Sequence, residues 1–185
     1  MHQKIILLLL IFSTVLSAKK PTTPGSHKRN KCDNGSKWTF DVYIPKAYAV
    51  KKDKQFPVLY LSSPGAYPGF LNLEKWAEKN EFLLITMNES KNGPWDIVFS
   101  VQKDVMSSTE YLRKHHALQF ATGFSGSAWA SVHLANSYPK KIAGVFMNCH
   151  SGNGTYLENK TCSVTLVSGN TDTIHSASHV EKAYK

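Results

Sequence analysis

Residues 118–128 read LQFATGFSGSA, an apolar run that leads directly into a serine between two glycines, Ser125. The apolar part predicts a buried strand, and the residues after the serine predict a helix. A tight turn between strand and helix makes a serine hydroxyl project from the backbone, as a nucleophile must. Large side chains two positions before and after such a serine would collide, and Gly123 and Ser127 are both small. The segment therefore predicts a nucleophilic serine at position 125.

The residue after the serine, Gly126, is expected at the first position of the predicted helix. Its backbone N–H and the helix dipole would stabilise the negatively charged oxygen that forms when a serine attacks a carbonyl group. A serine at this position also suits a plain N-cap, in which its side chain only caps the helix. Glycine and serine are common residues, so the strand before the turn and the helix after it carry the prediction.

Short β-type runs alternate with helix-type runs along the rest of the chain. This alternation predicts an α/β domain in which helices flank a mostly parallel sheet. The reactive residues of such sheets lie at the carboxyl ends of strands, where the serine turn also falls. The run 38–44 alternates apolar and polar residues and suits an edge or antiparallel strand. The expected strands are 38–44, 57–61, 82–87, 118–122, 142–147 and 163–167, and the expected helices are 71–79, 98–114, 129–138 and 176–184.

The segment 121–128, ATGFSGSA, resembles the nucleophile elbow of α/β-hydrolases. It is particularly similar to the elbow of secreted esterases of the polyhydroxybutyrate depolymerase, feruloyl esterase and carboxylesterase group, although Ser127 replaces the usual second glycine. Three other segments agree with this group in their order along the chain: FPVLYL at 56–61, NGPW at 92–95 and IAGV at 142–145. The resemblance covers roughly residues 38–182, and it implies an α/β-hydrolase fold whose C-terminal strand and helix are missing.

The resemblance also implies the partners of the serine. In this family the acid follows a late strand in a Gly-x-x-Asp turn, which VSGNTD at 167–172 matches, so Asp172 is the candidate that orients a histidine. An aspartate there also suits an Asx turn or a helix N-cap. The family's histidine follows its acid, and only His175 and His179 do so here; each also suits a surface or capping role. The histidines that precede the acid fit this order worse: His115, His116, His133 and His150.

A second oxyanion donor comes, in this family, from a His-Gly type loop after an early strand. The corresponding loop here is SSPGA at 62–66, which has no such pair. Pro64 has no N–H to offer. The resemblance therefore implies Gly65 as the donor, with Ser63 and Ala66 as the alternatives.

The N-terminal region combines a signal-like segment with a basic one. Residues 1–18 have the basic start, apolar core and small final residues of a secretory signal peptide. A membrane anchor is the alternative, but the apolar run is shorter than the roughly 20 residues that a spanning helix needs. Residues 19–36 are rich in basic and turn-forming residues, which predicts a flexible basic arm ahead of a domain over 37–185. We expect a secreted protein without stable membrane insertion.

The net charge of +9 allows contact with an anionic surface such as nucleic acid. No aromatic residues are interleaved with the basic ones in the arm, so a solvated arm without nucleic-acid binding is the better prediction. The three cysteines are Cys32, Cys149 and Cys162, and a loop rich in Gly, Asn and Lys between the last two favours their pairing. The Cys-x-x-Cys spacing of zinc sites is absent, and we expect neither a metal nor a cofactor. Glycosylation sequons begin at Asn34, Asn88, Asn153 and Asn159.

The sequence thus predicts a secreted serine hydrolase that acts on carboxylic esters through an acyl-enzyme on Ser125. The substrate is a small ester, a polyester or a feruloyl ester, between which the sequence does not choose. A serine peptidase is the alternative enzyme. Two further hypotheses are a non-catalytic binding protein on a hydrolase scaffold and an inactive fragment whose last strand and histidine lie beyond Lys185. Aromatic residues that could line an acyl or aryl pocket, or belong to the core, are Tyr67, Phe70, Trp95 and Trp129.

Overall fold

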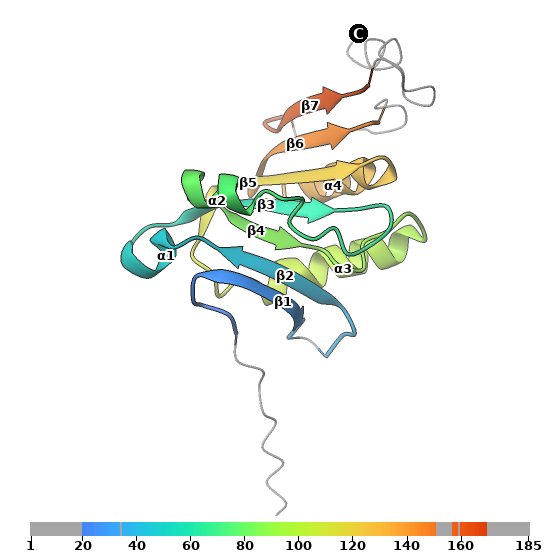
Figure 1. Ribbon diagram of the computed structural model, residues 1–185. Coiled ribbons are helices and arrows are strands. Elements are labelled where there is room, and N and C mark those ends of the chain that lie inside the picture. The colour runs from blue at the N-terminus through green and yellow to red at the C-terminus, as the bar shows by residue number, and fades with distance from the viewer. Residues whose placement is uncertain (1–19, 34, 151–156, 159, 170–185) are drawn as a thin grey trace, which may run out of the picture.

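The computed structural model describes residues 20–33, 35–150, 157–158 and 160–169. Within these residues the chain forms one seven-stranded sheet in the order β1-β2-β4-β3-β5-β6-β7, with helices on both faces (Figure 1). The strands are β1 (Gly25–Lys31), β2 (Thr39–Ile44), β3 (Phe56–Ser62), β4 (Leu83–Thr86), β5 (Lys114–Phe124), β6 (Ile142–Asn148) and β7 (Ser163–Val167). The helices are α1 (Ala47–Val50), α2 (Glu74–Asn80), α3 (Trp95–Ser108) and α4 (Gly126–Ser137).

The central part of the sheet is parallel. Strand β3 pairs in parallel with β4 on one side and with β5 on the other, and β5, β6 and β7 continue in parallel. All four residues of β4 are buried, as expected of a strand that is covered on both faces. The carboxyl ends of these strands therefore meet at one edge of the sheet, and Ser62 at the end of β3 pairs with Gly123 of β5. The sequence prediction of an α/β domain with a mostly parallel sheet is confirmed.

The sequence predicted a flexible basic arm over residues 19–36, but part of this segment is a strand. Residues 25–31 form β1, which pairs antiparallel with β2 from Gly25 opposite Ile44 to Lys31 opposite Thr39. Composition alone missed this strand because its partners lie elsewhere in the sequence: the Arg29 N–H donates to the Asp41 carboxylate at 2.8 Å. Strand β2, predicted as an edge or antiparallel strand, is antiparallel to both neighbours, and the charged β1 forms the edge.

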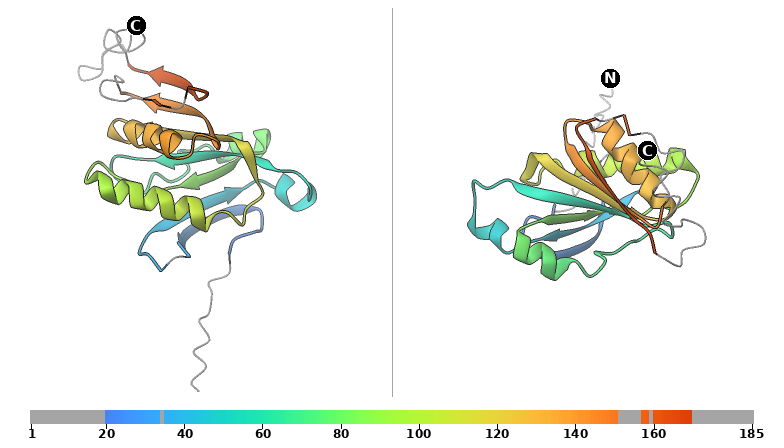
Figure 2. Two further views of the ribbon diagram at one scale, coloured as in Figure 1. Left: turned by 180° about the vertical axis from the view of Figure 1, so that it is seen from behind. Right: turned by 90° about the horizontal axis from the view of Figure 1, so that it is seen from above.

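The larger core lies between the sheet and the pair α3 and α4, which cover one face together (Figure 2). Alternate residues of each strand point toward these helices; Ala121 and Val145, for example, are 2% and 3% exposed. Helix α2 packs on the other face over β3 and β4, where Leu61, Phe70, Ala77 and Leu84 form a smaller core. This arrangement fixes α4, and hence the turn that leads into it, rigidly against the sheet.

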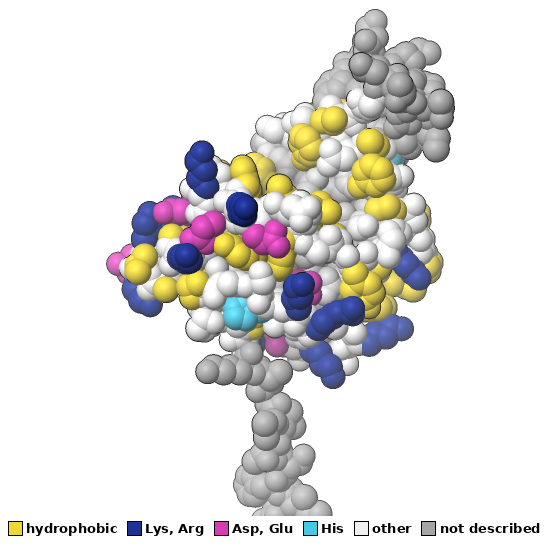
Figure 3. All heavy atoms as spheres, viewed as in Figure 1, with side chains coloured by type: hydrophobic (Ala, Val, Ile, Leu, Met, Phe, Trp, Pro, Cys, Tyr) yellow, Lys and Arg dark blue, Asp and Glu magenta, His cyan; other side chains and the backbone are white. Residues whose placement is uncertain are grey.

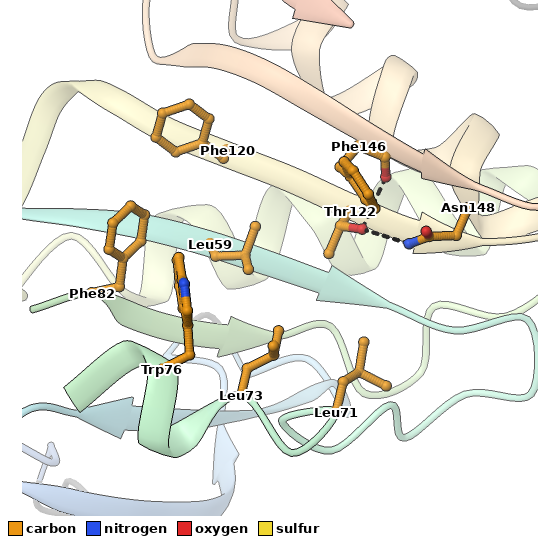
Figure 4. A pocket seen from close by; sticks show the side chains of 9 residues that line it. All are labelled: Leu59, Leu71, Leu73, Trp76, Phe82, Phe120, Thr122, Phe146 and Asn148. Carbon is orange, nitrogen blue, oxygen red and sulfur yellow. Dashed lines mark hydrogen bonds between the residues drawn. The ribbon is translucent and has the colours of Figure 1, made fainter. Parts of the chain in front are cut away.

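The face of β5, β6 and β7 that points away from α4 is not covered by the described residues. Hydrophobic side chains are visible over this part of the sheet in the space-filling view (Figure 3), and Leu118, Phe146 and Val167 are each about two fifths exposed, at 44%, 40% and 42%. A groove of about 480 Å³ runs between this face and α2 (Figure 4). Its lining residues are Leu59, Leu71, Leu73, Trp76, Phe82, Phe120, Thr122, Phe146 and Asn148.

The three cysteines are free thiols in the structure, so the predicted pairing of Cys149 with Cys162 is wrong. Cys149 follows the carboxyl end of β6, whereas Cys162 precedes the amino end of β7. Because β6 and β7 are parallel, the two residues lie at opposite edges of the sheet, six residues apart along the ladder or about 20 Å at the usual rise of about 3.3 Å per residue. A disulfide requires Cα atoms within about 7 Å. The third cysteine, Cys32, is buried, and burial raises its pKa to about 11.

One of the four glycosylation sequons is excluded by its burial. Asn88 is 0% exposed, and its side-chain Nδ2 donates to Asp41 Oδ1 at 2.9 Å and to Thr39 Oγ1 at 3.2 Å. A side chain held in this way cannot accept a glycan in the folded protein. Instead, it fixes the segment that follows β4. In the described part of the chain, no helix has the length and apolar character needed to cross a membrane.

Candidate active site

Ser125 lies between the last residue of β5 and the first residue of α4, with φ 52° and ψ −130°. A non-glycine residue rarely adopts a positive φ, and such a conformation costs of order 1–3 kcal/mol unless its surroundings hold it. The surroundings do so here: the Ser125 N–H donates to the Asn148 carbonyl of β6 at 2.8 Å, and the Ser125 carbonyl accepts from the Ala128 N–H at 2.9 Å. The predicted turn, with its serine in a strained conformation, is present.

The interpretation of Ser125 as a plain helix cap is wrong. It occupies the N-cap position of α4, but its side chain makes no capping hydrogen bond. An ordinary N-cap serine has an extended backbone and turns its oxygen back to the N–H groups of the first turn. The conformation of Ser125 instead leaves its hydroxyl without a hydrogen-bond partner among the described residues, and the residue is only half-buried.

The glycine two residues earlier is required by the backbone of the turn itself. A Cβ atom on Gly123 would overlap the Ser127 carbonyl group and would lie 2.8 Å from the Ala128 nitrogen. Because these are backbone atoms of the first turn of α4, they cannot move aside as a side chain would. On the other side of the serine, Ser127 is 1% exposed, and its small side chain fits where the resembled family has glycine.

Gly126, the expected oxyanion donor, is the first residue of α4. The N–H groups of a first helical turn have no partner inside the helix, and the positive end of the helix dipole lies there. A Cβ atom at this position would meet the carboxamide of Asn92, at 2.7 Å from Cγ and 2.8 Å from Nδ2, and would displace it. The structure thus brings Asn92 to the serine turn, which no sequence signal had indicated.

The loop after β3 lies beside the turn, because Ser62 pairs with Gly123. Its N–H groups are partly used within the loop: the Ala66 N–H donates to the Ser63 carbonyl at 3.1 Å. The Gly65 N–H makes only a long contact of 3.4 Å with Ser63 Oγ, and Gly65 is exposed. Of the three predicted donors in this loop, Ala66 is therefore already occupied, whereas Gly65 remains free to donate to a ligand.

The predicted acid and both predicted bases, Asp172, His175 and His179, lie outside the described residues. Among the histidines that are described, His133 lies on α4, stacks on Phe99 with ring centroids 3.5 Å apart and hydrogen-bonds to Gln102 at 2.7 Å. Burial lowers its pKa. These contacts turn it toward α3, so it is a packing residue.

Three more of the histidines considered in the sequence are described, and they fall into two groups. His115 and His116 lie at the amino end of β5, next to Lys114, which pairs with Phe56, whereas Gly123 pairs with Ser62 six residues further along β3. At the usual rise of about 3.3 Å per residue, the amino end of β5 is about 20 Å from the serine turn. His150 lies two residues beyond β6, at the same edge of the sheet as Ser125, since Asn148 contacts that residue. His150 fitted the family's chain order poorly because it precedes the predicted acid. Its place at the edge of the sheet that carries Ser125 follows only from the parallel pairing of β5 and β6.

The apolar groove ends close to the serine turn. Figure 4 places Thr122 and Asn148 side by side, and their side chains hydrogen-bond at 3.4 Å. The carbonyl of the same asparagine holds the Ser125 N–H. The four aromatic residues proposed from the sequence as pocket lining do not line this groove. Phe70 is buried under α2, Tyr67 lies against Arg29, and Trp95 packs against Trp129 with ring centroids 4.3 Å apart and the rings tilted by 58°.

Among the described residues, no group of three or more His, Cys, Asp or Glu side chains is placed to hold a metal ion. The groups that the described part of the site offers are its backbone N–H groups and its projecting serine. These groups suit a nucleophilic attack on a carbonyl carbon, with the developing negative charge stabilised at the start of α4.

This strand order, this parallel register and a serine at the turn after β5 define the α/β-hydrolase fold, which the chain adopts. Comparison with solved structures agrees. The chain is similar to a thermostable esterase, with a TM-score of 0.62 and 11% identity over 85% of this chain and 49% of that one. It is also similar to a ferulic acid esterase, with a TM-score of 0.50 and 14% identity over 69% of this chain and 59% of that one.

The chain thus spans about half to three fifths of the length of these two structures. At such identities the likeness shows the fold. No protein-family model matches the sequence, and no curated protein matches it.

Proposed function

We propose that this protein is a secreted serine hydrolase that cleaves carboxylic esters through an acyl-enzyme on Ser125. The observation that carries the proposal is the backbone of this residue: φ 52° without a capping hydrogen bond, held by the Asn148 carbonyl. A strained conformation at a strand-to-helix turn needs a reason, because a relaxed cap would be more stable. Projection of a nucleophilic hydroxyl is such a reason, and two solved esterases share the fold.

The proposed reaction has two steps. The Ser125 oxygen bonds to the ester carbonyl carbon while its proton passes to a base, and the carbonyl electron pair moves onto the oxygen. The Gly126 N–H stabilises that oxyanion until the carbonyl re-forms and expels the alcohol, which takes up the proton. Water then repeats the sequence on the acyl-enzyme and releases the acid. Sequence order favours His175 or His179 as the base and Asp172 as the residue that orients it.

We propose ester hydrolysis rather than peptide hydrolysis because the groove near the serine is mostly apolar. Apart from Thr122 and Asn148, its walls are aliphatic or aromatic side chains, which suit the apolar part of an ester. A peptide substrate would need partners for its backbone N–H and carbonyl groups. Secretion is part of the proposal through the signal-like residues 1–18.

A binding protein on the same scaffold is the second candidate, because the Ser125 hydroxyl has no histidine partner among the described residues. Turnover of p-nitrophenyl acetate and p-nitrophenyl butyrate by the full chain separates the two functions. We expect release of p-nitrophenol that Ser125→Ala abolishes. The matched control is Ser100→Ala, which removes an exposed hydroxyl on α3 that donates a hydrogen bond to the Asp96 carbonyl one turn earlier. Equal turnover by wild type and Ser125→Ala would refute the serine hydrolase.

A further inference from the structure

The segment that follows β4 is fastened to the loop that follows β3. The Asn92 N–H donates to the Pro64 carbonyl at 3.1 Å, and Gly65 and Lys91 form an antiparallel bridge next to it. Immediately afterwards α3 begins at Trp95, whose ring packs against the ring of Trp129 in α4. Asn92 is therefore held at its backbone from two sides, and its position relative to the start of α4 is fixed by the fold.

The side chain of Asn92 lies against the first residue of α4. Its Cγ and Nδ2 atoms are 2.7 Å and 2.8 Å from the point where a Cβ of Gly126 would be, and its Oδ1 is nearer still. The carboxamide thus fills the space that a side chain at position 126 would take. It sits beside the residue whose N–H faces the expected oxyanion, although Asn92 itself is exposed to solvent.

An oxyanion needs more than one donor, and the loop after β3 supplies few. Pro64 has no N–H, and the Ala66 N–H is bonded to the Ser63 carbonyl, which leaves only the Ser63 and Gly65 N–H groups as candidates there. The Asn92 carboxamide, by contrast, makes no hydrogen bond to a described residue, so both of its N–H bonds can face a ligand. A half turn of the amide exchanges Nδ2 and Oδ1 without moving the rest of the residue. Side-chain amides are established oxyanion donors in other hydrolases.

We propose that the Asn92 Nδ2–H donates a hydrogen bond to the oxyanion formed on Ser125, together with the Gly126 N–H. The inference rests on the proposed serine hydrolase function and adds a catalytic residue to it. No proton is transferred in this contact: as the serine oxygen bonds to the carbonyl carbon, the carbonyl electron pair becomes the charge that the amide stabilises. Because Gly126 has no side chain, the amide can occupy the space beside the N–H of that residue.

The test is steady-state hydrolysis of p-nitrophenyl acetate by the full chain, comparing wild type with Asn92→Ala and Asn92→Asp. Loss of one such donor lowers kcat about 10²- to 10³-fold. We expect a loss of this size for both variants, with KM changed less than about threefold. The aspartate has the same shape but no donor, so it separates hydrogen bonding from packing. Asn80→Ala is the control: its amide bonds the Trp76 carbonyl within α2, and it should keep wild-type kcat.

A double-mutant cycle adds a readout that a merely structural role would not move. Gly126→Ala should displace the amide, so it should lose activity alone but cost little more in combination with Asn92→Ala. Suppose that wild-type turnover depends on Ser125 but that kcat of both Asn92→Ala and Asn92→Asp stays within about threefold of wild type. This result would overturn the role of Asn92 and would leave the proposed serine hydrolase intact. Absence of Ser125-dependent turnover in the wild type would overturn both.

Discussion

Replacing Gly123 by alanine tests the geometry of the serine turn without touching the serine. The added Cβ would overlap the carbonyl of Ser127 and come within 2.8 Å of the Ala128 nitrogen, whereas ordinary contacts begin near 3.4 Å. The first turn of α4 would have to move by more than half an ångström, while the Ser125 N–H is bonded to β6. Overpacking of this kind costs about 1–3 kcal/mol, and we expect the upper end, about 3 kcal/mol, because the obstacle is backbone.

Urea denaturation followed by tryptophan fluorescence measures this loss, and thermal unfolding should show Tm lower by about 6 to 12 °C for a chain of this size. The matched control is Gly65→Ala, whose Cβ would meet nothing within 4 Å. Gly144→Ala, whose Cβ would lie 3.1 Å from the Phe120 ring and 3.4 Å from the Ser163 carbonyl oxygen, should fall between the two. If Gly123→Ala were as stable as Gly65→Ala, the reasoning about the turn would be refuted.

Four further results are expected. Ser125→Gly should be more stable to urea than wild type by about 1 kcal/mol, because glycine relieves the positive φ; a loss of stability would contradict the strain. Burial lowers the pKa of Lys114 to about 8 from 10.5, so the unfolded chain binds one more proton at this residue between these values, and the urea midpoint of wild type should gain on that of Lys114→Met from pH 8 to 10; a constant difference would contradict the shift. Asn88→Ala should cost about 1–3 kcal/mol by leaving buried groups unpaired, and peptide mass spectrometry of protein secreted from eukaryotic cells should find Asn88 without a glycan. Iodoacetamide added with denaturant but without reductant should label both Cys149 and Cys162; a linked peptide pair would contradict the register of β6 and β7.

Most of the sheet could be predicted from the sequence, because buried strands are short apolar runs between turn signals. The boundaries were less accurate where a local hydrogen bond or a dihedral angle decided them. The helix expected to reach Lys114 ends at Ser108, since Thr109 turns its hydroxyl back to the Val105 carbonyl at 2.8 Å and leaves the helix. The helix expected from Leu71 begins at Glu74, because residue 71 has a φ of 52°.

The residues of the candidate site also divide into those that the sequence could predict and those that it could not. The serine turn was visible because its requirements are local: a strand, small neighbours and a helix within eleven residues. Asn92 and His150 were not, because their places at the turn depend on the pairing of strands far apart in the sequence, through Pro64 and Asn148 respectively. The strand β1 was missed for another reason: its residues are charged and polar, and it is held by pairing with the neighbouring β2. Asp172, His175 and His179 rest on family order alone, since they lie outside the described residues.

The most direct test of the central claim is covalent labelling with a fluorophosphonate probe, followed by peptide mapping. Wild-type protein should carry one probe per chain on Ser125, Ser125→Ala should carry none, and Ser100→Ala should be labelled like the wild type. Specific labelling of Ser125 would establish an activated nucleophile at the turn between β5 and α4. A probe on another residue, or a folded wild-type chain that never reacts, would contradict the account.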